Sequence, residues 1–304
     1  TMNWHETIAF LTHCLPKAAA RPLNALPEGS LREIRVRAGQ PIRLLTCQGE
    51  KLCLCEPTPQ QVAQMAEALC EHALYARAEE QRGGFVTLRG GHRMGLCGRV
   101  ICQGQMVRAL REISSFCIRI AGQWRGAADG LLPHLTDEHG RCRSVLIVGL
   151  PGMGKTTLLR DSLRRLSEAG RRVCVVDERS EIAAMCDGLP QLEVGPCTDV
   201  LDGCGKEAGF RWLLRSLSPE VLATDELSSL SDAQAVLEAI HSGVSVLATV
   251  HGRELDSVRS RSALYPLVRS QAFDRYAVLD PCETGKLAGV FDRDFRPVAP
   301  GEEA

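Results

Sequence analysis

Hydrophobic positions in the second half of the chain fall into short continuous runs that alternate with longer stretches of helical periodicity. The apolar runs predict buried strands at 145–148, 173–177, 221–225 and 244–250. The periodic stretches predict helices at 155–168 and 231–242, the second capped by Ser231. Strands that alternate with helices predict an α/β fold with a parallel sheet covered on both faces.

The first part of the chain has a different pattern. Leu31–Arg37 alternates apolar and charged residues, as a half-exposed strand does. Thr58 and Gln61 form a capping box ahead of an apolar stripe, which predicts a helix over 58–74. Hairpins follow from residue 85. We therefore expect a smaller α+β domain at 1–125 and an α/β domain at 126–304, with the linker inside 122–135.

A phosphate-binding motif follows the first strand of the second domain. Residues 149–156 read GLPGMGKT and match the phosphate-loop pattern G-x-x-x-x-G-K-[ST] without a mismatch. Glycines let backbone N–H groups surround a phosphate, and the helix that follows adds its free N–H groups. The alternative is a glycine-rich turn that binds nothing. The residues expected to bind nucleotide are Gly149, Pro151, Gly152, Met153, Gly154, Lys155, Thr156 and Thr157.

Acidic residues end two of the other predicted strands. Val221–Glu226 has the form of a Walker B strand. In such a strand Asp225, together with the Thr156 hydroxyl, would bind Mg²⁺. Glu226 could then polarise the attacking water. The alternative is a pair of surface carboxylates that end a strand.

A second acidic stretch, Asp177–Glu181, offers Glu178 and Glu181 for the same role as Glu226. The sequence does not choose among these three glutamates. His251 closes another strand, where it would sense the γ-phosphate, hydrogen-bond to a carboxylate, or have only a structural role.

Composition narrows the possible partners. The formal net charge is −1, so no global basic field favours nucleic acid, although a local basic patch remains open. The fourteen cysteines contain no C-x-x-C pair and are expected to be reduced, small apolar residues of a cytoplasmic chain. We find neither a signal peptide nor an apolar run of about 20 residues. Membrane association is therefore expected only through partners, without direct insertion.

The order of these motifs resembles the secretion ATPase superfamily, which carries a Walker A loop, an acidic box, a Walker B strand and a histidine box. The resemblance implies a RecA-like ATPase domain that uses ATP and Mg²⁺ and assembles as a homo-oligomeric, hexameric ring. It also implies that an arginine on the strand 115–121, here Arg119, reaches the nucleotide. Two features depart from that family: Asp225 replaces a glycine before Glu226, and residues 227–229 lack an arginine.

Several further stretches resemble a sporulation branch of that superfamily, among them LREIRVRAGQP, VVDERSEIA and AIHSGVSVLATVHG. This resemblance implies an ATPase of the channel that joins mother cell and forespore during endospore formation. It further implies a peripheral position at the mother-cell face of the forespore membrane, with membrane proteins of that channel as partners. Two rival hypotheses are a nucleotide-gated scaffold with little turnover and a nucleic-acid translocase.

Overall fold

A computed structural model describes residues 2–71, 84–104 and 106–298. The chain forms two compact units, and each is described by itself. The first unit runs to Gly122 and also includes Ala184–Leu192, while the second comprises Gln123–Ala183 and the chain from Glu193 onward. The predicted boundary lies at 125/126, and the prediction leaves Ala184–Leu192 in the second domain, whereas the structure groups these residues with the first unit.

The first unit contains short helices and an antiparallel sheet. Its elements are α1 (Trp4–Cys14), α2 (Lys17–Asn24), β1 (Leu31–Arg37), β2 (Ile42–Thr46), β3 (Gly49–Cys53), α3 (Pro59–Leu69), β4 (Phe85–Thr87), η2 (Arg89–Gly91), β5 (Arg93–Gln103), β6 (Met106–Arg119), β9 (Met185–Cys186) and β10 (Leu189–Pro190). Thr58 caps α3 through the predicted capping box with Gln61. Residues 72–74 of that predicted helix lie outside the described residues.

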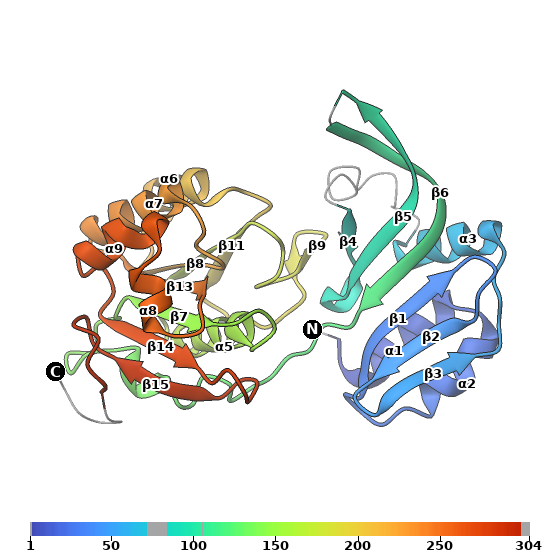
Figure 1. Cartoon of the computed structure of the whole chain (residues 1–304), viewed down its shortest axis with the longest axis horizontal. Helices are drawn as coiled ribbons and strands as arrows, with labels where there is room; N and C mark the ends of the chain where they lie inside the picture. Colours follow the sequence, from blue (N-terminus) through green and yellow to red (C-terminus); the bar gives the residue numbers. More distant parts are fainter. Residues whose placement is uncertain (1, 72–83, 105, 299–304) are drawn as a thin grey trace. The chain divides into compact units, whose positions relative to one another are not determined.

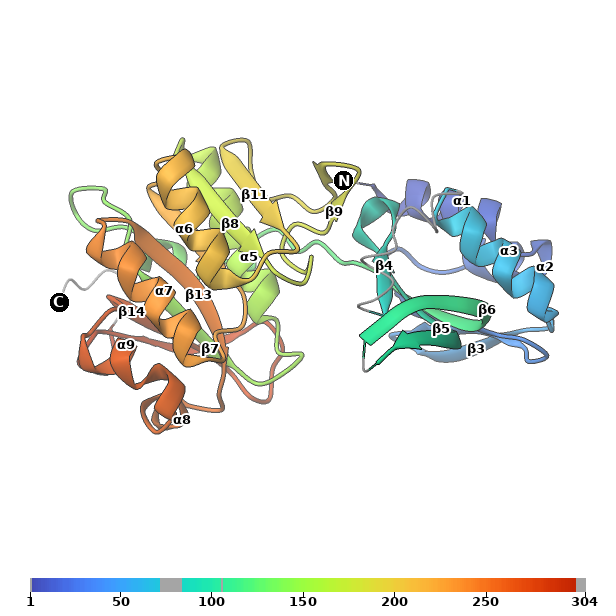
Figure 2. The ribbon, with the colours of Figure 1, turned by 90° about the horizontal axis from the view of Figure 1, so that it is seen from above.

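The sheet of the first unit has the strand order β3-β2-β1-β6-β5-β4. Helices α1, α2 and α3 gather on one of its faces (Figure 2). Their apolar sides meet the sheet in a core that includes Leu11, Leu23, Ile34, Leu69 and Ile118. Beyond this core, β5 and β6 pair only with each other from Arg99 and Arg111 outward, so their ends form a two-stranded arm (Figure 1).

The second unit contains the α/β part of the chain. Its elements are η3 (Leu132–His134), β7 (Val145–Gly149), α5 (Lys155–Glu168), β8 (Val173–Asp177), β11 (Thr198–Asp202), α6 (Lys206–Ser216), β12 (Val221–Thr224), α7 (Leu230–His241), β13 (Ser245–His251), α8 (Leu255–Arg259), η4 (Ser262–Leu264), α9 (Tyr265–Arg269), β14 (Arg275–Leu279) and β15 (Leu287–Phe291). In the described part of the chain, no helix combines the length and the apolar character that crossing a bilayer requires.

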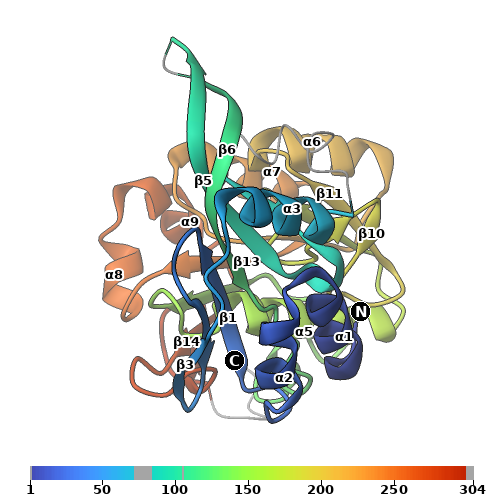
Figure 3. The same ribbon diagram turned by 90° about the vertical axis from the view of Figure 1, so that its right-hand side faces the viewer.

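The strands of the second unit form one sheet in the order β11-β8-β12-β13-β7-β14-β15. All neighbouring pairs are parallel except β14 and β15. Helices α6, α7 and α9 cover one face and α5 covers the other (Figure 3), as right-handed crossovers require when the chain steps in opposite directions along the sheet. Because the strands are buried on both faces, their sequences read as continuous apolar runs.

One local prediction needs correction. Ser229, not Ser231, caps α7, because the Ser229 hydroxyl accepts the Asp232 N–H and the Asp232 carboxylate accepts the Ser229 N–H. At the end of the described chain, β15 adds to the central sheet as an antiparallel edge strand beside β14. The chain then turns back on β15 in a hairpin, in which Phe291 faces Pro297 and the Val298 N–H donates to the Val290 carbonyl at 2.8 Å.

Candidate active site

The sheet topology brings three strand ends together at one edge. In the register of β13 against β7, His251 is the partner of Gly149, the residue that opens the phosphate loop. Strand β12 is the other neighbour of β13, and Asp225 follows its last residue. Parallel strands end at the same edge of a sheet, so the loops after β7, β12 and β13 converge there.

The phosphate loop has the backbone conformation that its glycines permit. Gly154 has a φ of 91° and is the N-cap of α5, in the left-handed region that L side chains avoid. An added Cβ at this residue would lie 3.4 Å from the backbone of Gly285. The Gly285 N–H also donates to the Met153 carbonyl at 3.0 Å. The loop between β14 and β15 thus supports the phosphate loop from outside.

A cavity of about 440 Å³ opens at this edge. Its lining combines phosphate-loop residues with acidic and basic side chains from the neighbouring strand ends. The lining residues are Pro151, Gly152, Gly154, Lys155, Thr156, Thr157, Arg179, Glu181, Asp225, Glu226 and His251. Gly149 and Met153 are predicted nucleotide-binding residues that do not line the cavity; they shape the loop behind it.

Two hard oxygen ligands lie together in the cavity. The Thr156 hydroxyl donates to Asp225 Oδ2 at 2.5 Å. The other oxygen of Asp225 accepts the Thr249 hydroxyl, which fixes the carboxylate orientation. Mg²⁺ prefers oxygen ligands and takes few of them from the protein, with waters and phosphate oxygens completing its shell. A hydroxyl beside an oriented carboxylate fits this ion.

Lys155 is held at the centre of the site. Its Nζ lies 3.0 Å from the Leu150 carbonyl and 3.0 Å from Nδ1 of His251. Burial lowers the pKa of this amine, and the nearby carboxylates of Asp225 and Glu226 act in the opposite direction. A partly desolvated ammonium gains strongly from a multiply charged anion such as a phosphate chain.

Glu226 uses both of its carboxylate oxygens. Oε1 lies 2.9 Å from Nε2 of His251, and Oε2 accepts from Arg179 Nη1 at 2.5 Å. Its backbone N–H donates at 2.9 Å to the Thr249 hydroxyl. The residue has a φ of 53°, in the left-handed region that non-glycine residues seldom occupy. Such strained backbone concentrates at functional sites, where surrounding contacts hold it in place.

The acidic box is built around a buried carboxylate. Asp177 accepts the backbone N–H groups of Glu181, Ile182 and Ala183 at 2.9, 3.0 and 2.8 Å. Burial raises the pKa of Asp177, although these three hydrogen bonds act to lower it. Arg160 completes the anchor by donating to the carbonyl of Glu181 at 2.7 Å, and burial lowers its pKa to about 10. Asp177 therefore shapes the loop and does not face the cavity.

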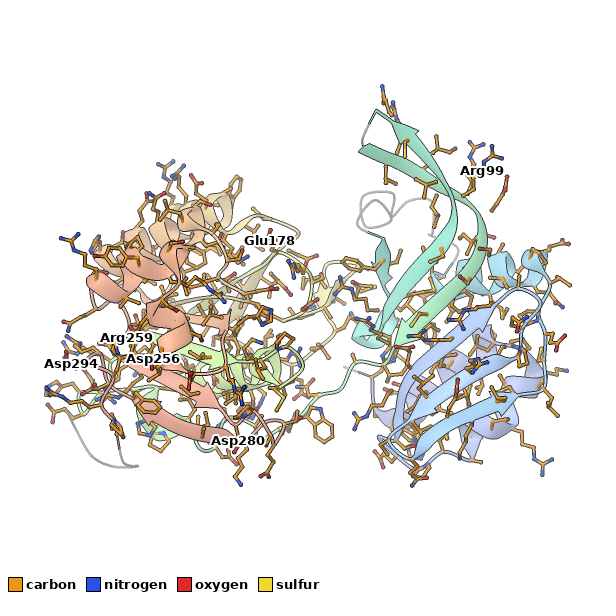
Figure 4. The ribbon with its side chains drawn as sticks, viewed as in Figure 1. Arg99, Glu178, Asp256, Arg259, Asp280 and Asp294 are labelled. Atoms are coloured by element: carbon orange, nitrogen blue, oxygen red, sulfur yellow. The ribbon has the colours of Figure 1, made fainter. Side chains whose placement is uncertain are left out.

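The three glutamates that are candidates for orienting water differ in whether they line the cavity. Glu181 and Glu226 line the cavity. Glu178, labelled in Figure 4, pairs with Lys206 at the start of α6 and is absent from the cavity lining. Arg119 belongs to the first unit, where its exposed side chain lies 4.0 Å from Glu33.

Sequence reasoning missed three residues of this site. Thr249 precedes His251 by two residues on one strand, so the period-two rule places both side chains on the same face and could have identified Thr249. Arg160 lies in α5, and the spacing of the arginines in that helix does not indicate that Arg160 is buried. Arg179 sits in a loop that Asp177 anchors locally and that Arg160 holds from a helix 21 or 22 residues earlier, so its direction depends partly on a non-local contact.

The chain is similar in sequence to proteins of sporulation and of secretion. Stage III sporulation protein AA of Bacillus subtilis (strain 168) is 39% identical over 295 residues, which cover 93% of this chain and 95% of that protein. The type II secretion system ATPase E of Vibrio cholerae is 31% identical over 107 residues, 35% of this chain and 20% of that protein.

Solved structures show the same fold at low sequence identity. The ATPase DotB of Legionella pneumophila aligns with a TM-score of 0.55 and 14% identity, over 90% of this chain and 76% of that one. The pilus retraction motor PilT aligns with a TM-score of 0.59 and 15% identity, over 82% and 74%. The second unit therefore has the RecA-like P-loop fold of the secretion ATPases. The model of the family described as sporulation stage III, protein AA matches residues 15–297, and the chain belongs to that family.

Proposed function

We propose that this chain hydrolyses ATP in the presence of Mg²⁺. The observation that carries the proposal is the meeting of Lys155, Thr156, Asp225, Glu226 and His251 around one cavity at the carboxyl edge of the sheet. Phosphoryl transfer depends on positioning and on charge stabilisation, and this edge supplies both a cation and hard oxygen ligands. The similarity to proteins named secretion ATPases supports the same chemistry.

The cavity residues divide the work in this proposal. Lys155 and the loop N–H groups of residues 151–156 bind the phosphates. Thr156 and Asp225 hold Mg²⁺, which would neutralise the charge that develops on the phosphate oxygens. Thr249 keeps Asp225 in a fixed orientation through the hydroxyl contact described above.

Glu226 is the residue that we assign to orienting the attacking water. It lies next to Asp225 and so beside the metal ligands, and His251 fixes one of its oxygens at 2.9 Å. Glu181 also lines the cavity and is the second candidate. Glu178 is disfavoured because Lys206 holds it away from the lining.

At the level of the cell, we propose that the chain powers or assembles the channel between mother cell and forespore. The 39% identity with a stage III sporulation protein over nearly the whole chain supports this assignment. The proposal includes a hexameric ring in which Arg119 supplies charge across a subunit boundary, and membrane proteins of the channel as partners. It places the protein in the cytoplasm, peripheral at the mother-cell face of the forespore membrane.

The test separates an enzyme from a scaffold that only binds nucleotide. Binding of a fluorescent ATP analogue and phosphate release are measured for the full chain, Lys155→Ala and Glu226→Gln, with and without Mg²⁺. We expect Lys155→Ala to lose binding, and Glu226→Gln to bind but lose at least about a hundredfold in turnover. Turnover that stays unchanged in Glu226→Gln and also in Glu181→Gln would contradict a water-orienting role for either glutamate.

A further inference from the structure

Arg179 is a cavity-lining cation outside the set of predicted site residues. It lies two residues after the end of β8, in the loop that Asp177 anchors through the N–H groups of Glu181 and Ile182. Arg160 holds the same loop from the other side by donating to the Ile182 carbonyl at 2.5 Å. The backbone that carries Arg179 is therefore fixed at the rim of the nucleotide cavity.

The guanidinium of Arg179 faces the cavity with donors to spare. Within the described chain, its one hydrogen-bond partner is Glu226, through a single nitrogen, and the side chain is 60% exposed. A guanidinium has five N–H donors in a planar fork that matches phosphate oxygens. Arg179 lines the same 440 Å³ cavity as Lys155 and Thr156, so a bound phosphate chain would meet these donors.

The charge of its partner determines whether the Arg179 guanidinium binds the Glu226 carboxylate or a phosphate more strongly. An exposed arginine–carboxylate pair is worth little. A terminal phosphate carries more negative charge than a carboxylate, and a bidentate arginine–phosphate contact is among the stronger hydrogen-bonded pairs. A phosphate at the position of Oε2 would therefore compete effectively with Glu226 for Arg179.

The consequence concerns Glu226. Its Oε1 lies beside His251 and its Oε2 beside Arg179, so both oxygens are engaged. A carboxylate that orients water needs an oxygen free to accept a hydrogen bond. Transfer of Arg179 from Glu226 to the terminal phosphate would release Oε2 for that purpose.

We propose that Arg179 is a phosphate-contacting residue, supplied by the same chain as Lys155, which binds the γ-phosphate of ATP and in doing so frees Glu226 to orient water. This inference rests on the proposed ATPase function. It differs from the Arg119 proposal because it needs no second subunit. It also distinguishes ATP from ADP, since ADP lacks the phosphate that Arg179 would contact.

The experiment measures affinities for ATP and ADP by calorimetry, with Mg²⁺ and the full chain. The variants are Arg179→Ala, Arg179→Lys and the matched control Arg211→Ala, which removes another half-exposed arginine that pairs with a glutamate, on α6. We expect Arg179→Ala to weaken ATP binding at least about tenfold, as the loss of a charged hydrogen bond would, and to leave ADP binding within about threefold. Arg179→Lys should recover part of the ATP affinity, and Arg211→Ala should match the wild type.

A second arm tests the link to Glu226. Glu226→Gln removes the charged competitor for Arg179, so it should tighten ATP binding, and Arg179→Ala in that background should abolish the gain. Equal losses of ATP and ADP affinity in Arg179→Ala, or an ATP affinity within twofold of the wild type, would overturn the proposal. Lys155→Ala is the reference: if it too binds ATP like the wild type, the ATPase assignment itself has failed, and not the role of Arg179 alone.

Discussion

Lys155 Nζ and His251 Nδ1 lie 3.0 Å apart, and the other ring nitrogen of His251, Nε2, lies 2.9 Å from Glu226 Oε1. An ammonium has donors only, so Nδ1 is the acceptor in the contact with Lys155. His251 therefore links Lys155 to Glu226 through its two ring nitrogens.

The first prediction concerns His251→Ala. We expect turnover to fall at least about tenfold, because Glu226 loses the His251 contact that orients its Oε1. ATP affinity should stay within about threefold of the wild type, because Lys155 keeps its charge. Steady-state kinetics measures turnover and calorimetry measures ATP affinity. The control is His241→Ala, which changes an exposed histidine at the end of α7. A loss of ATP affinity without a loss of turnover would contradict the bridging role.

The second prediction concerns the anchor of the acidic box. Asp177→Asn cannot present two anionic oxygens to the three N–H groups that it now accepts. We expect the free energy of unfolding to fall by about 2 kcal/mol and turnover to fall with it, since the loop carries Glu181. Urea unfolding and phosphate release are compared with Asp199→Asn, an exposed acid on β11. Equal stability of the two variants would show that Asp177 is not an anchor.

The third prediction concerns the backbone of the phosphate loop. Gly154→Ala places a side chain at a φ of 91° and against the backbone of Gly285 at 3.4 Å. We expect a loss of about 1–2 kcal/mol in stability together with weaker ATP binding. Gly205→Ala is the control, because that glycine has a φ of −63° and open space around it. The account is wrong here if both variants bind ATP as the wild type does.

The fourth prediction concerns pH and lies in the first unit. Burial lowers the pKa of His92 to about 4, while its Nδ1 accepts the Ala121 N–H at 3.1 Å. A buried base with a lowered pKa stays neutral when folded but takes up a proton when unfolded. Its stabilising contribution is therefore present above pH 6.5 and is lost as the pH falls toward 4.

We expect this residue alone to remove about 3 kcal/mol of unfolding free energy by pH 4. Urea unfolding at a series of pH values, for the wild type and His92→Gln, isolates its share from that of other groups. The variant should show a shallower dependence on pH between 6.5 and 4. Parallel curves for the two proteins would refute the assignment.

Much of the second unit could be predicted because its signals are local. Continuous apolar runs identified β7, β8, β12 and β13, and the phosphate-loop pattern placed the start of α5 at Lys155, as observed. The position of β15 could not be predicted in this way. Its pairing with β14 is a tertiary choice that a hairpin-like tail sequence does not encode.

The same distinction applies to the candidate site. Residues at strand ends, such as Asp225 and His251, were identified because parallel strands deliver their last residues to one edge. Glu178 and Glu181 are three residues apart in one loop, and only the anchors at Asp177 and Arg160 decide that Glu181 lines the cavity. Because the contact of Arg160 with this loop is non-local, sequence spacing left the glutamates undecided.

The most direct test of the central claim is Mg²⁺-dependent phosphate release from ATP by the full chain, measured over a series of protein concentrations. Wild type is compared with Lys155→Ala, Arg119→Ala and the control Arg211→Ala. The account predicts activity per chain that rises with concentration, is abolished in Lys155→Ala and Arg119→Ala, and is retained in Arg211→Ala. Activity that is indifferent to concentration and to Arg119 would contradict the shared-site ring. The absence of any Lys155-dependent hydrolysis over the whole series would contradict the ATPase assignment itself.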